Sequence, residues 1–183
     1  MSAHVDEGVM ARGTAPTYWR SPMLPNGSPF PRLSLPTPEG DELVLPAAAR
    51  GGHAVVLVYR GAWCPYCVGQ LRSFARRHDL LLAENITTVA LSADSCTTAR
   101  QTVQDLHIPF AVGCEADVPQ VASALECYTD PDMTFFQSSG FVLDADGKIM
   151  LALYSSGPIG RLGPADVLRF VNKRRDKNGA TAS

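Results

Sequence analysis

Two cysteines separated by two residues are the feature of this 183-residue chain that most clearly indicates chemistry. They are Cys64 and Cys67, at the end of the segment Arg60-Gly-Ala-Trp-Cys-Pro-Tyr-Cys. In a helix, residues three apart lie about one turn from each other, so two such sulfurs can form and break a disulfide without moving the backbone. The spacing therefore predicts reversible dithiol–disulfide exchange at Cys64 and Cys67.

The surroundings of the pair predict that its thiols are activated. Residues 54–59 form a continuous apolar run, which is typical of a strand buried on both faces of a sheet. Between residues 67 and 82, apolar side chains recur every three or four positions, which predicts an amphipathic helix. The first N–H groups of a helix stabilise an anion, and the reactive form of cysteine is the anionic thiolate. A strand-to-helix junction therefore favours a lowered thiol pKa.

Other uses of the pair fit the rest of the sequence less well. A structural zinc site needs four ligands, but Cys96, Cys114 and Cys127 stand singly and His107 has no histidine nearby. A purely structural disulfide between residues three apart closes almost no loop. We therefore predict no metal and no other cofactor, and a redox role for the pair.

The three remaining cysteines receive the opposite interpretation. Free cysteine is among the most buried residue types and usually behaves as a small apolar side chain. We therefore expect Cys96, Cys114 and Cys127 to be core or surface residues without a catalytic role. The alternative is that one of them serves as an auxiliary resolving thiol.

The elements around the pair predict an α/β fold with a mixed central sheet flanked by helices. The periodic patterns and turn residues predict a small hairpin, then alternating strands and helices, then a second hairpin and a final helix. The expected strands are residues 32–35, 42–45, 54–59, 86–91, 109–112, 141–144 and 148–154, and the expected helices are 67–82, 95–106, 118–125 and one beginning near 164.

Composition limits the other classes of protein. The chain is 45% hydrophobic, which favours a globular domain. Its formal net charge of −2 provides no positive electrostatic field that would attract the phosphates of a nucleic acid. Its longest apolar run is far shorter than the roughly 20 residues of a membrane helix. The first ten residues lack the apolar segment of a secretory signal, so we predict a cytoplasmic location. We divide the chain into a flexible Pro/Gly-rich arm (1–28), one domain (29–176) and a tail (177–183).

The motifs carry a family resemblance. Trp63-Cys-Pro-Tyr-Cys after a buried strand resembles the active site of thioredoxin-fold proteins. The longer segment from Val58 to Cys67, together with Phe141-Val-Leu-Asp-Ala-Asp-Gly-Lys-Ile, resembles the peroxiredoxin-like branch of the alkyl hydroperoxide reductase and thiol-specific antioxidant family. The resemblance covers roughly residues 30–172 and implies a thioredoxin-like fold with an N-terminal β-hairpin.

The resemblance assigns the two cysteines in two ways. In the thioredoxin order, Cys64 is an exposed nucleophile that attacks a disulfide, and Cys67 resolves the mixed disulfide. In the peroxiredoxin order, the family's Thr-X-X-Cys aligns with Cys64-Pro-Tyr-Cys, so that Cys67 is oxidised by peroxide to a sulfenic acid and Cys64 resolves it. Both orders remain open at the level of sequence.

The chain departs from both templates. Cys64 replaces the family's threonine, and Ser138 or a neighbour replaces the arginine that precedes the Phe141 strand. Arg60 stands where the family has a proline; it is either a substitute charge or, more commonly for such a position, a solvent-exposed residue. The cis-proline of thioredoxins is also absent, since Ser138-Ser139-Gly140 occupies its place.

Aromatic residues near the motif have expected positions as well. Trp63 is expected to shield one side of the cysteine pair. Phe135 and Phe136 either line a groove beside the thiols or pack in the core, and the core is favoured.

Together these features predict a thiol–disulfide oxidoreductase or thiol peroxidase that acts through Cys64 and Cys67. The expected substrate is a peroxide or a disulfide, and the expected reductant is thioredoxin, glutaredoxin or a low-molecular-weight thiol. We expect no nucleic-acid or membrane partner, and a homodimer is a candidate assembly. The alternative function is a redox partner or sensor that binds a specific protein without turnover.

Overall fold

A five-stranded mixed sheet forms the centre of the protein. A computed structural model describes residues 23–49 and 51–181. Along the sheet, the order is β5 (Ala111–Gly113), β4 (Ile86–Leu91), β3 (His53–Val58), β6 (Ser139–Leu143) and β7 (Ile149–Tyr154). β3, β4 and β5 are parallel, whereas β6 and β7 run antiparallel to their neighbours. The predicted α/β fold with a mixed central sheet is confirmed.

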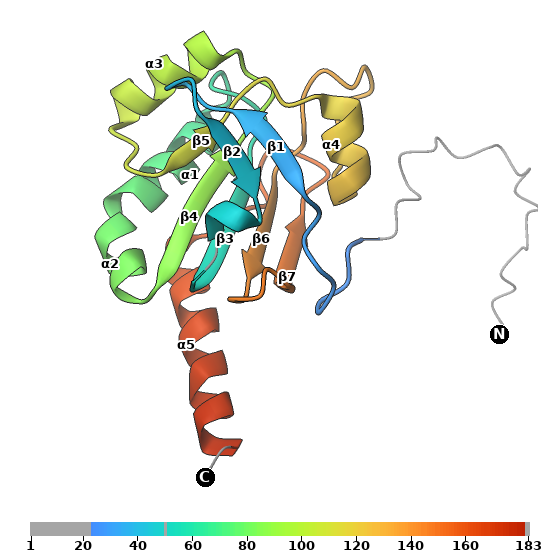
Figure 1. The fold of residues 1–183 in the computed structure, drawn as a ribbon. Coiled ribbons are helices and arrows are strands. Elements are labelled where there is room, and N and C mark those ends of the chain that lie inside the picture. The colour runs from blue at the N-terminus through green and yellow to red at the C-terminus, as the bar shows by residue number, and fades with distance from the viewer. Residues whose placement is uncertain (1–22, 50, 182–183) are drawn as a thin grey trace, which may run out of the picture.

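A separate two-stranded hairpin precedes the sheet, as predicted. β1 (Leu33–Pro36) pairs with β2 (Glu42–Leu45), and a one-turn 3-10 helix, η2 (Ala47–Ala49), follows. Alternation along β1 and β2 turns their leucines toward the same side, where they are buried. The hairpin therefore acts as a lid over one face of the central sheet (Figure 1).

Five α-helices complete the described part of the chain. They are α1 (Pro65–Arg76), α2 (His78–Ala83), α3 (Cys96–Leu106), α4 (Val118–Leu125) and α5 (Pro164–Thr181). The helix predicted over residues 67–82 is thus two helices, because the backbone leaves helical geometry at Arg77 (φ −109°, ψ 10°). The break lets Leu81 enter the core, while Leu80 and Leu82 are left exposed. α5 continues through residues 177–181, in the segment predicted as a tail.

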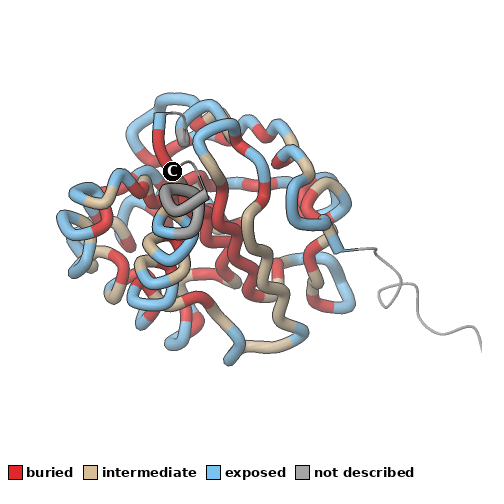
Figure 2. The backbone as a smooth tube through the Cα atoms, turned by 90° about the horizontal axis from the view of Figure 1, so that it is seen from below, coloured by how far each residue is buried: buried red, intermediate tan, exposed pale blue. Residues whose placement is uncertain are grey.

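Helices α1, α2, α3 and α5 cover one face of the sheet, and the hairpin and α4 cover the other (Figures 1 and 2). Val55 and Leu57 of β3 point into a cluster shared with α1, α2, α3 and α5. Val56 and Val58 point into the other cluster, with the hairpin and α4. β3 is therefore buried on both faces, as its continuous apolar run predicted.

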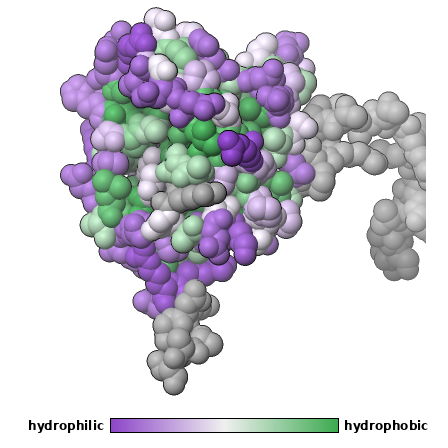
Figure 3. All heavy atoms as spheres, in the orientation of Figure 1, coloured by the Kyte–Doolittle hydropathy of each residue, from purple (hydrophilic) through white to green (hydrophobic). Residues whose placement is uncertain are grey.

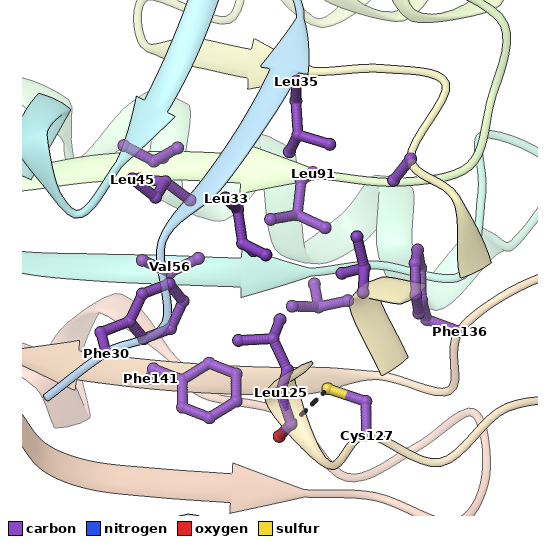
Figure 4. Packing of buried hydrophobic residues seen from close by; sticks show 14 of the residues in the cluster. Phe30, Leu33, Leu35, Leu45, Val56, Leu91, Leu125, Cys127, Phe136 and Phe141 are labelled. Atoms are coloured by element: carbon purple, nitrogen blue, oxygen red, sulfur yellow. Dashed lines mark hydrogen bonds between the residues drawn. The ribbon is translucent and has the colours of Figure 1, made fainter. Parts of the chain in front are cut away.

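The core on the hairpin side is built from aliphatic residues and aromatic rings (Figure 4). Phe30 packs edge-on against Phe141, with ring centroids 5.3 Å apart. Cys127 is buried in this cluster, where its sulfur lies 3.9 Å from the carbonyl oxygen of Leu125, and burial raises the pKa of its thiol to about 12. This agrees with the prediction that Cys127 is a core residue.

The surface seen in the orientation of Figure 1 is mixed. Apolar residues gather toward the middle of this face, and hydrophilic residues predominate around it (Figure 3).

The last residues of the predicted arm are joined to the domain. Gly27 and Phe30 donate backbone N–H bonds to Ile149 and Gly147, of 2.7 and 2.9 Å, so this segment runs along the β6–β7 hairpin. The prediction of a flexible arm falls mainly on residues 1–22, which lie outside the described residues. Within the described residues, no helix has the length and apolar character needed to cross a membrane.

Candidate active site

The cysteine pair lies at the junction of β3 and α1, where the sequence placed it. β3 ends at Val58, and Cys64 is the N-cap of α1, followed by Pro65 in its first turn. Proline suits this position because its missing N–H would have no partner there and its φ is already helical. The N–H groups of Cys67 and Val68 turn back to the carbonyl of Cys64 and begin the helix.

The loop between β3 and α1 is held by a glycine and an aspartate. Gly61 has φ +149°, and a Cβ built there would lie 2.4 Å from Nε1 of Trp63, so only glycine fits without a shift of the ring. The next residue, Ala62, donates its N–H to Oδ2 of Asp94 at 2.9 Å. Asp94 follows β4, so the active-site loop is anchored to the neighbouring strand.

Both cysteines carry free thiols and both are buried. The exposed Cys64 of the thioredoxin order is therefore wrong for this conformation, in which neither residue exposes measurable surface. The Cys67 thiol hydrogen-bonds the Cys64 sulfur, which places the two side chains in direct contact. This contact is what dithiol–disulfide exchange requires.

Arg60 supplies the first positive charge at the pair. Its Nη1 lies 3.7 Å from Sγ of Cys64, and its backbone N–H donates to Sγ of Cys67 at 3.3 Å. The guanidinium is held between two rings, 4.7 Å from the centroid of Trp63 and 5.0 Å from that of Phe135. Of the two alternatives for Arg60, the structure favours the substitute charge over the solvent-exposed residue.

Arg161 supplies a second positive charge, which the sequence analysis missed. Its Nη1 and Nη2 each lie 3.6 Å from Sγ of Cys67, and Nη2 is 3.9 Å from Sγ of Cys64. Gln70, one turn after Cys67 on α1, accepts from Nη1 at 3.0 Å. Gln70 in turn donates to the carbonyl of Leu162 at 3.0 Å, which fixes the amide and the arginine together.

The family has an arginine just before the strand that corresponds to Phe141. In this chain a positive charge reaches the site from a different segment, through Arg161. Ser138 is buried at the expected position and accepts a backbone bond from Ser155. Arg161 lies 94 residues after Cys67, in a stretch rich in glycine and proline between β7 and α5. Nothing in its spacing connects it with the motif. A lone arginine in an otherwise small and apolar loop is the only signal that the sequence offered.

The thiol pKa values of the two cysteines move in opposite directions. Burial alone would raise the pKa of Cys64, but N–H groups of Cys67 and Tyr66, the Cys67 thiol and Arg60 hold it below its ordinary value of 9.0. Burial raises the pKa of Cys67, although the N–H of Arg60 and the charge of Arg161 oppose the rise. The lowered pKa favours the thiolate form of Cys64, and the raised pKa favours the protonated form of Cys67.

Aromatic residues line the outside of the site. Trp63 is 56% exposed and packs edge-on against Phe135, with centroids 5.1 Å apart, so it covers Arg60 rather than lying only over the sulfurs. Phe136 is buried in the core, as favoured, whereas Phe135 is half-buried at the site. Tyr66 is also exposed, at the start of α1.

Asp130 positions Phe135. Its carboxylate accepts the backbone N–H groups of Thr134 and Phe135, at 2.7 and 2.8 Å, and the hydroxyl of Thr134 at 2.9 Å. Burial would raise the pKa of this carboxyl, but these hydrogen bonds outweigh it and lower the pKa. The loop that carries Phe135 to Arg60 is thus organised around one ionised side chain.

The structure corrects the interpretation of two other cysteines. Cys96 and Cys114, expected to be unpaired, form a disulfide across a sequence separation of 18. Cys96 is the first residue of α3, which follows β4, and Cys114 directly follows β5. Because β4 and β5 are parallel, both cysteines lie at the same end of the sheet. Parallel pairing of β4 and β5 brings these ends together, which sequence spacing does not show. Among residues 23–49 and 51–181, no three His, Cys, Asp or Glu side chains gather to hold a metal ion.

Comparison with known proteins identifies the family of the chain. The model of the AhpC/TSA family matches residues 26–152. The chain belongs to the AhpC/TSA family. It is similar to Peroxiredoxin 2 of Sulfurisphaera tokodaii, with 26% identity over 161 residues that cover 84% of this chain and 74% of that protein.

Solved structures of peroxiredoxins share the fold of this AhpC/TSA protein. The peroxidoxin BcpB of Mycobacterium tuberculosis matches with a TM-score of 0.66 and 18% identity, covering 74% of this chain and 88% of that one. A yeast mitochondrial 1-Cys peroxiredoxin matches with a TM-score of 0.72 and 20% identity, covering 86% and 80%. The predicted family and thioredoxin-like fold are confirmed, and membership of this family supports the predicted oxidoreductase class.

Proposed function

We propose that this protein reduces peroxides through Cys64 and Cys67, with Cys64 as the attacking thiolate and Cys67 as the resolving thiol. The observation that carries the proposal is the placement of two guanidinium groups, from Arg60 and Arg161, against the two sulfurs. Such groups stabilise a thiolate and the negative charge that develops on a peroxide as its O–O bond breaks.

The positive charge of these arginines is available to a reacting anion. Within the described residues, the only salt bridges join Arg169 to Asp166 and Arg175 to Glu84. Neither Arg60 nor Arg161 is neutralised by a carboxylate. Their positions are fixed instead by neutral groups, namely the rings of Trp63 and Phe135 and the amide of Gln70. A preorganised, unneutralised charge is what an anionic transition state requires.

In the order that we propose, the thiol with the lowered pKa attacks first. The Cys64 thiolate attacks the terminal oxygen of the hydroperoxide, forms an S–O bond and breaks the O–O bond, which leaves a sulfenic acid and an alkoxide. The Cys67 thiol gives its proton to the alkoxide, and an alcohol leaves. The Cys67 thiolate then attacks the sulfur of the sulfenic acid, and hydroxide departs and takes a proton from solvent to become water. The product is a Cys64–Cys67 disulfide.

The cycle closes when an external thiol reduces this disulfide. Two electrons and two protons come from thioredoxin, glutaredoxin or two low-molecular-weight thiols, which are oxidised to a disulfide. Trp63 and Tyr66 expose 56% and 51% of their surface beside the pair. We propose that this aromatic rim is the surface on which the reductant docks, because exposed aromatic residues are favoured at binding surfaces.

Intact mass spectrometry after one equivalent of peroxide tests the proposal. The wild type should lose two hydrogens as the disulfide forms. Cys67→Ser should gain one oxygen on Cys64, because the sulfenic acid can no longer be resolved within the pair. Cys64→Ser should react far more slowly, because the thiol that remains has a raised pKa.

Cys127→Ala is the matched control, since Cys127 is buried in the opposite core and should leave all three results unchanged. Oxidation that accumulates in Cys64→Ser instead would reverse the two roles. If peroxide oxidises neither variant nor the wild type, and no disulfide substrate is reduced, the peroxidase proposal fails and the non-turnover redox partner gains support.

A further inference from the structure

The Cys96–Cys114 disulfide lies where three segments of the chain meet. Cys96 opens α3, Cys114 follows β5, and Pro36 at the end of β1 accepts the backbone N–H of Cys114 at 2.9 Å. In Figure 1 these segments come together at the end of the sheet that carries α3. The disulfide therefore joins the turn after β4 to the turn after β5.

The turn after β4 is the one that holds the active-site loop. Asp94, two residues before Cys96, accepts the N–H of Ala62 through Oδ2, and its own carbonyl accepts the N–H of Glu115 at 2.8 Å. Glu115 follows Cys114 directly, and its Oε1 accepts the N–H of Cys96 at 3.2 Å. The disulfide and these bonds clamp the two turns together, with Asp94 as the link to the loop of Cys64.

The clamp is also a point of backbone strain. Glu115 has φ +52°, a left-handed conformation that is unfavourable for a residue with a side chain and that is retained only where surrounding contacts fix it. The covalent bond at Cys114 and the two bonds to Asp94 and Cys96 are the contacts that fix it here. The covalent bond is the one of these contacts that a reductant can remove.

The disulfide has the features of a reducible bond. Cys96 is partly exposed, whereas Cys114 is buried, so Cys96 is the more accessible residue of the pair. Sγ of Cys114 lies 3.3 Å from the carbonyl oxygen of Pro36, so the thiol formed on reduction would find a hydrogen-bond acceptor in place. The reduced state therefore buries no unsatisfied thiol.

We propose that Cys96–Cys114 is a second redox-active site, a switch that controls access to Cys64 through Asp94. A dithiol reductant attacks Sγ of Cys96, the bond to Cys114 breaks, and the Cys114 thiolate takes a proton. The second thiol of the reductant then resolves the mixed disulfide and releases Cys96 as a thiol. In total, two electrons and two protons pass from the dithiol to the protein, and the dithiol becomes a disulfide.

Reduction opens the loop, and oxidation closes it. With the clamp reduced, Asp94 no longer holds Ala62 in place, and the segment from Gly61 to Cys64 gains freedom. The Cys64 sulfur, buried while the clamp is oxidised, then becomes accessible. The inference rests on the proposed role of Cys64 as the reactive thiol, but it does not require peroxide to be the substrate.

The test measures alkylation of Cys64 in the Cys67→Ser variant, where the first pair cannot close. Peptide mapping after oxidation in a glutathione buffer should find Cys96 and Cys114 linked, and graded dithiothreitol should separate them. Iodoacetamide should then alkylate Cys64 about tenfold faster in the dithiothreitol-reduced protein than in the oxidised one. Cys96→Ser/Cys114→Ser, in the same background, should alkylate at the fast rate in both conditions.

Two substitutions at Asp94 test the link itself. Asp94→Ala removes the acceptor for Ala62, so Cys64 should alkylate fast whether or not the disulfide is present. Asp94→Asn keeps an acceptor oxygen and should retain the dependence on redox state, which controls for misfolding of the alanine variant. Cys127→Ala should retain the dependence as well.

Defined outcomes would overturn the switch. Cysteines 96 and 114 that stay as free thiols under oxidation contradict it, as does a Cys64 rate that is unchanged or slower in the reduced protein. A redox dependence that persists in Asp94→Ala contradicts the link through Asp94. Alkylation reports on the switch even if peroxide oxidises neither cysteine, so failure of the switch and failure of the peroxidase proposal are distinguishable.

Discussion

The two cysteine pairs lie in similar places but in opposite electrostatic surroundings. Each has one cysteine at the start of a helix that follows a parallel strand, Cys64 before α1 and Cys96 at the start of α3. The first pair is bracketed by the guanidinium groups of Arg60 and Arg161. The second lies beside a carboxylate, since Oε1 of Glu115 accepts the backbone N–H of Cys96 at 3.2 Å.

This difference shows that a helix N-terminus does not determine the chemistry of a thiol by itself. Around Cys64, the N–H groups of Tyr66 and Cys67 and the positive charge of Arg60 favour the thiolate, the form of cysteine that attacks a substrate. At Cys96, the side chain of Glu115 accepts the N–H of the helix start, and the sulfur is joined to a partner 18 residues away. The first pair is therefore suited to turnover, and the second to holding the structure until a reductant opens it.

Replacing the attacking cysteine should have the largest effect. Cys64→Ser should lower the rate of peroxide reduction by about a thousandfold or more, because the nucleophile itself is lost. Cys96→Ser/Cys114→Ser should instead raise the same rate by about tenfold relative to the wild type with its disulfide closed, because the loop is then open. Single-turnover stopped-flow measurement of peroxide consumption, with no thiol reductant present, checks both. Equal losses in the two variants would contradict the division of roles.

The free energy of unfolding should depend more on the Cys96–Cys114 disulfide than on the Cys64–Cys67 pair. Under non-reducing conditions, Cys96→Ser/Cys114→Ser should lower the free energy of unfolding by about 3 kcal/mol, the value expected for a loop of this length. Oxidising the Cys64–Cys67 pair should add little, because residues three apart close almost no loop. Urea unfolding under non-reducing conditions measures this difference in the free energy of unfolding. As a control, adding the same concentration of dithiothreitol to both proteins should remove the difference between wild type and variant.

Removing the positive charges should affect the first pair only. Arg60→Met should move the pH at which Cys64 becomes reactive upward, toward the ordinary thiol value of 9.0, because Arg60 lowers its pKa. Arg161→Met should act mainly on Cys67, whose pKa it lowers through its charge. Near neutral pH, we expect each variant to react about tenfold more slowly with peroxide.

The pH dependence of iodoacetamide alkylation, peptide by peptide, separates the two arginines. Arg161→Lys is the control that keeps the charge but loses the forked geometry, and it should recover part of the rate. A pH profile that does not move in Arg60→Met would mean that the N–H groups of the helix start alone set the Cys64 pKa.

A smaller effect is expected from the amide that holds Arg161. Gln70→Leu keeps the size of the side chain but removes the acceptor for Arg161 and the donor to Leu162. The rate of peroxide reduction should fall by about two- to fivefold, less than in Arg161→Met, because the charge remains but is less well placed. If Gln70 acts only through Arg161, the double variant should react no more slowly than Arg161→Met.

The smallest effect should come from Asp130. Its folded-state pKa is lowered, so it stabilises the native protein above its unfolded pKa of 3.8 and loses this contribution as the pH falls through the folded value. Asp130→Asn should therefore lower the melting temperature by a few degrees at pH 7 and by less at pH 3. Calorimetry at the two pH values checks this, and an equal shift at both would show that charge is not the cause.

Much of the framework could be predicted from the sequence because it depends on short-range patterns. The continuous apolar run of β3 and the Asp-Gly turn before β7 indicate their elements through neighbours a few residues away. The break at Arg77 was missed, because the apolar spacing continues across it and only packing decides which leucine enters the core. The same reasoning explains why the Cys64–Cys67 pair was found.

The sequence by itself therefore determined the fold class, the family and the redox-suited pair, since residues at fixed local spacing lie close together in any fold of this kind. Only the tertiary structure decided which charges surround that pair and which cysteine meets which. Arg161 reaches Cys67 from 94 residues away, and Cys114 reaches Cys96 because β4 and β5 are parallel neighbours. Contacts of this kind depend on how the strands are ordered in the sheet, and that order leaves no regular spacing in the sequence.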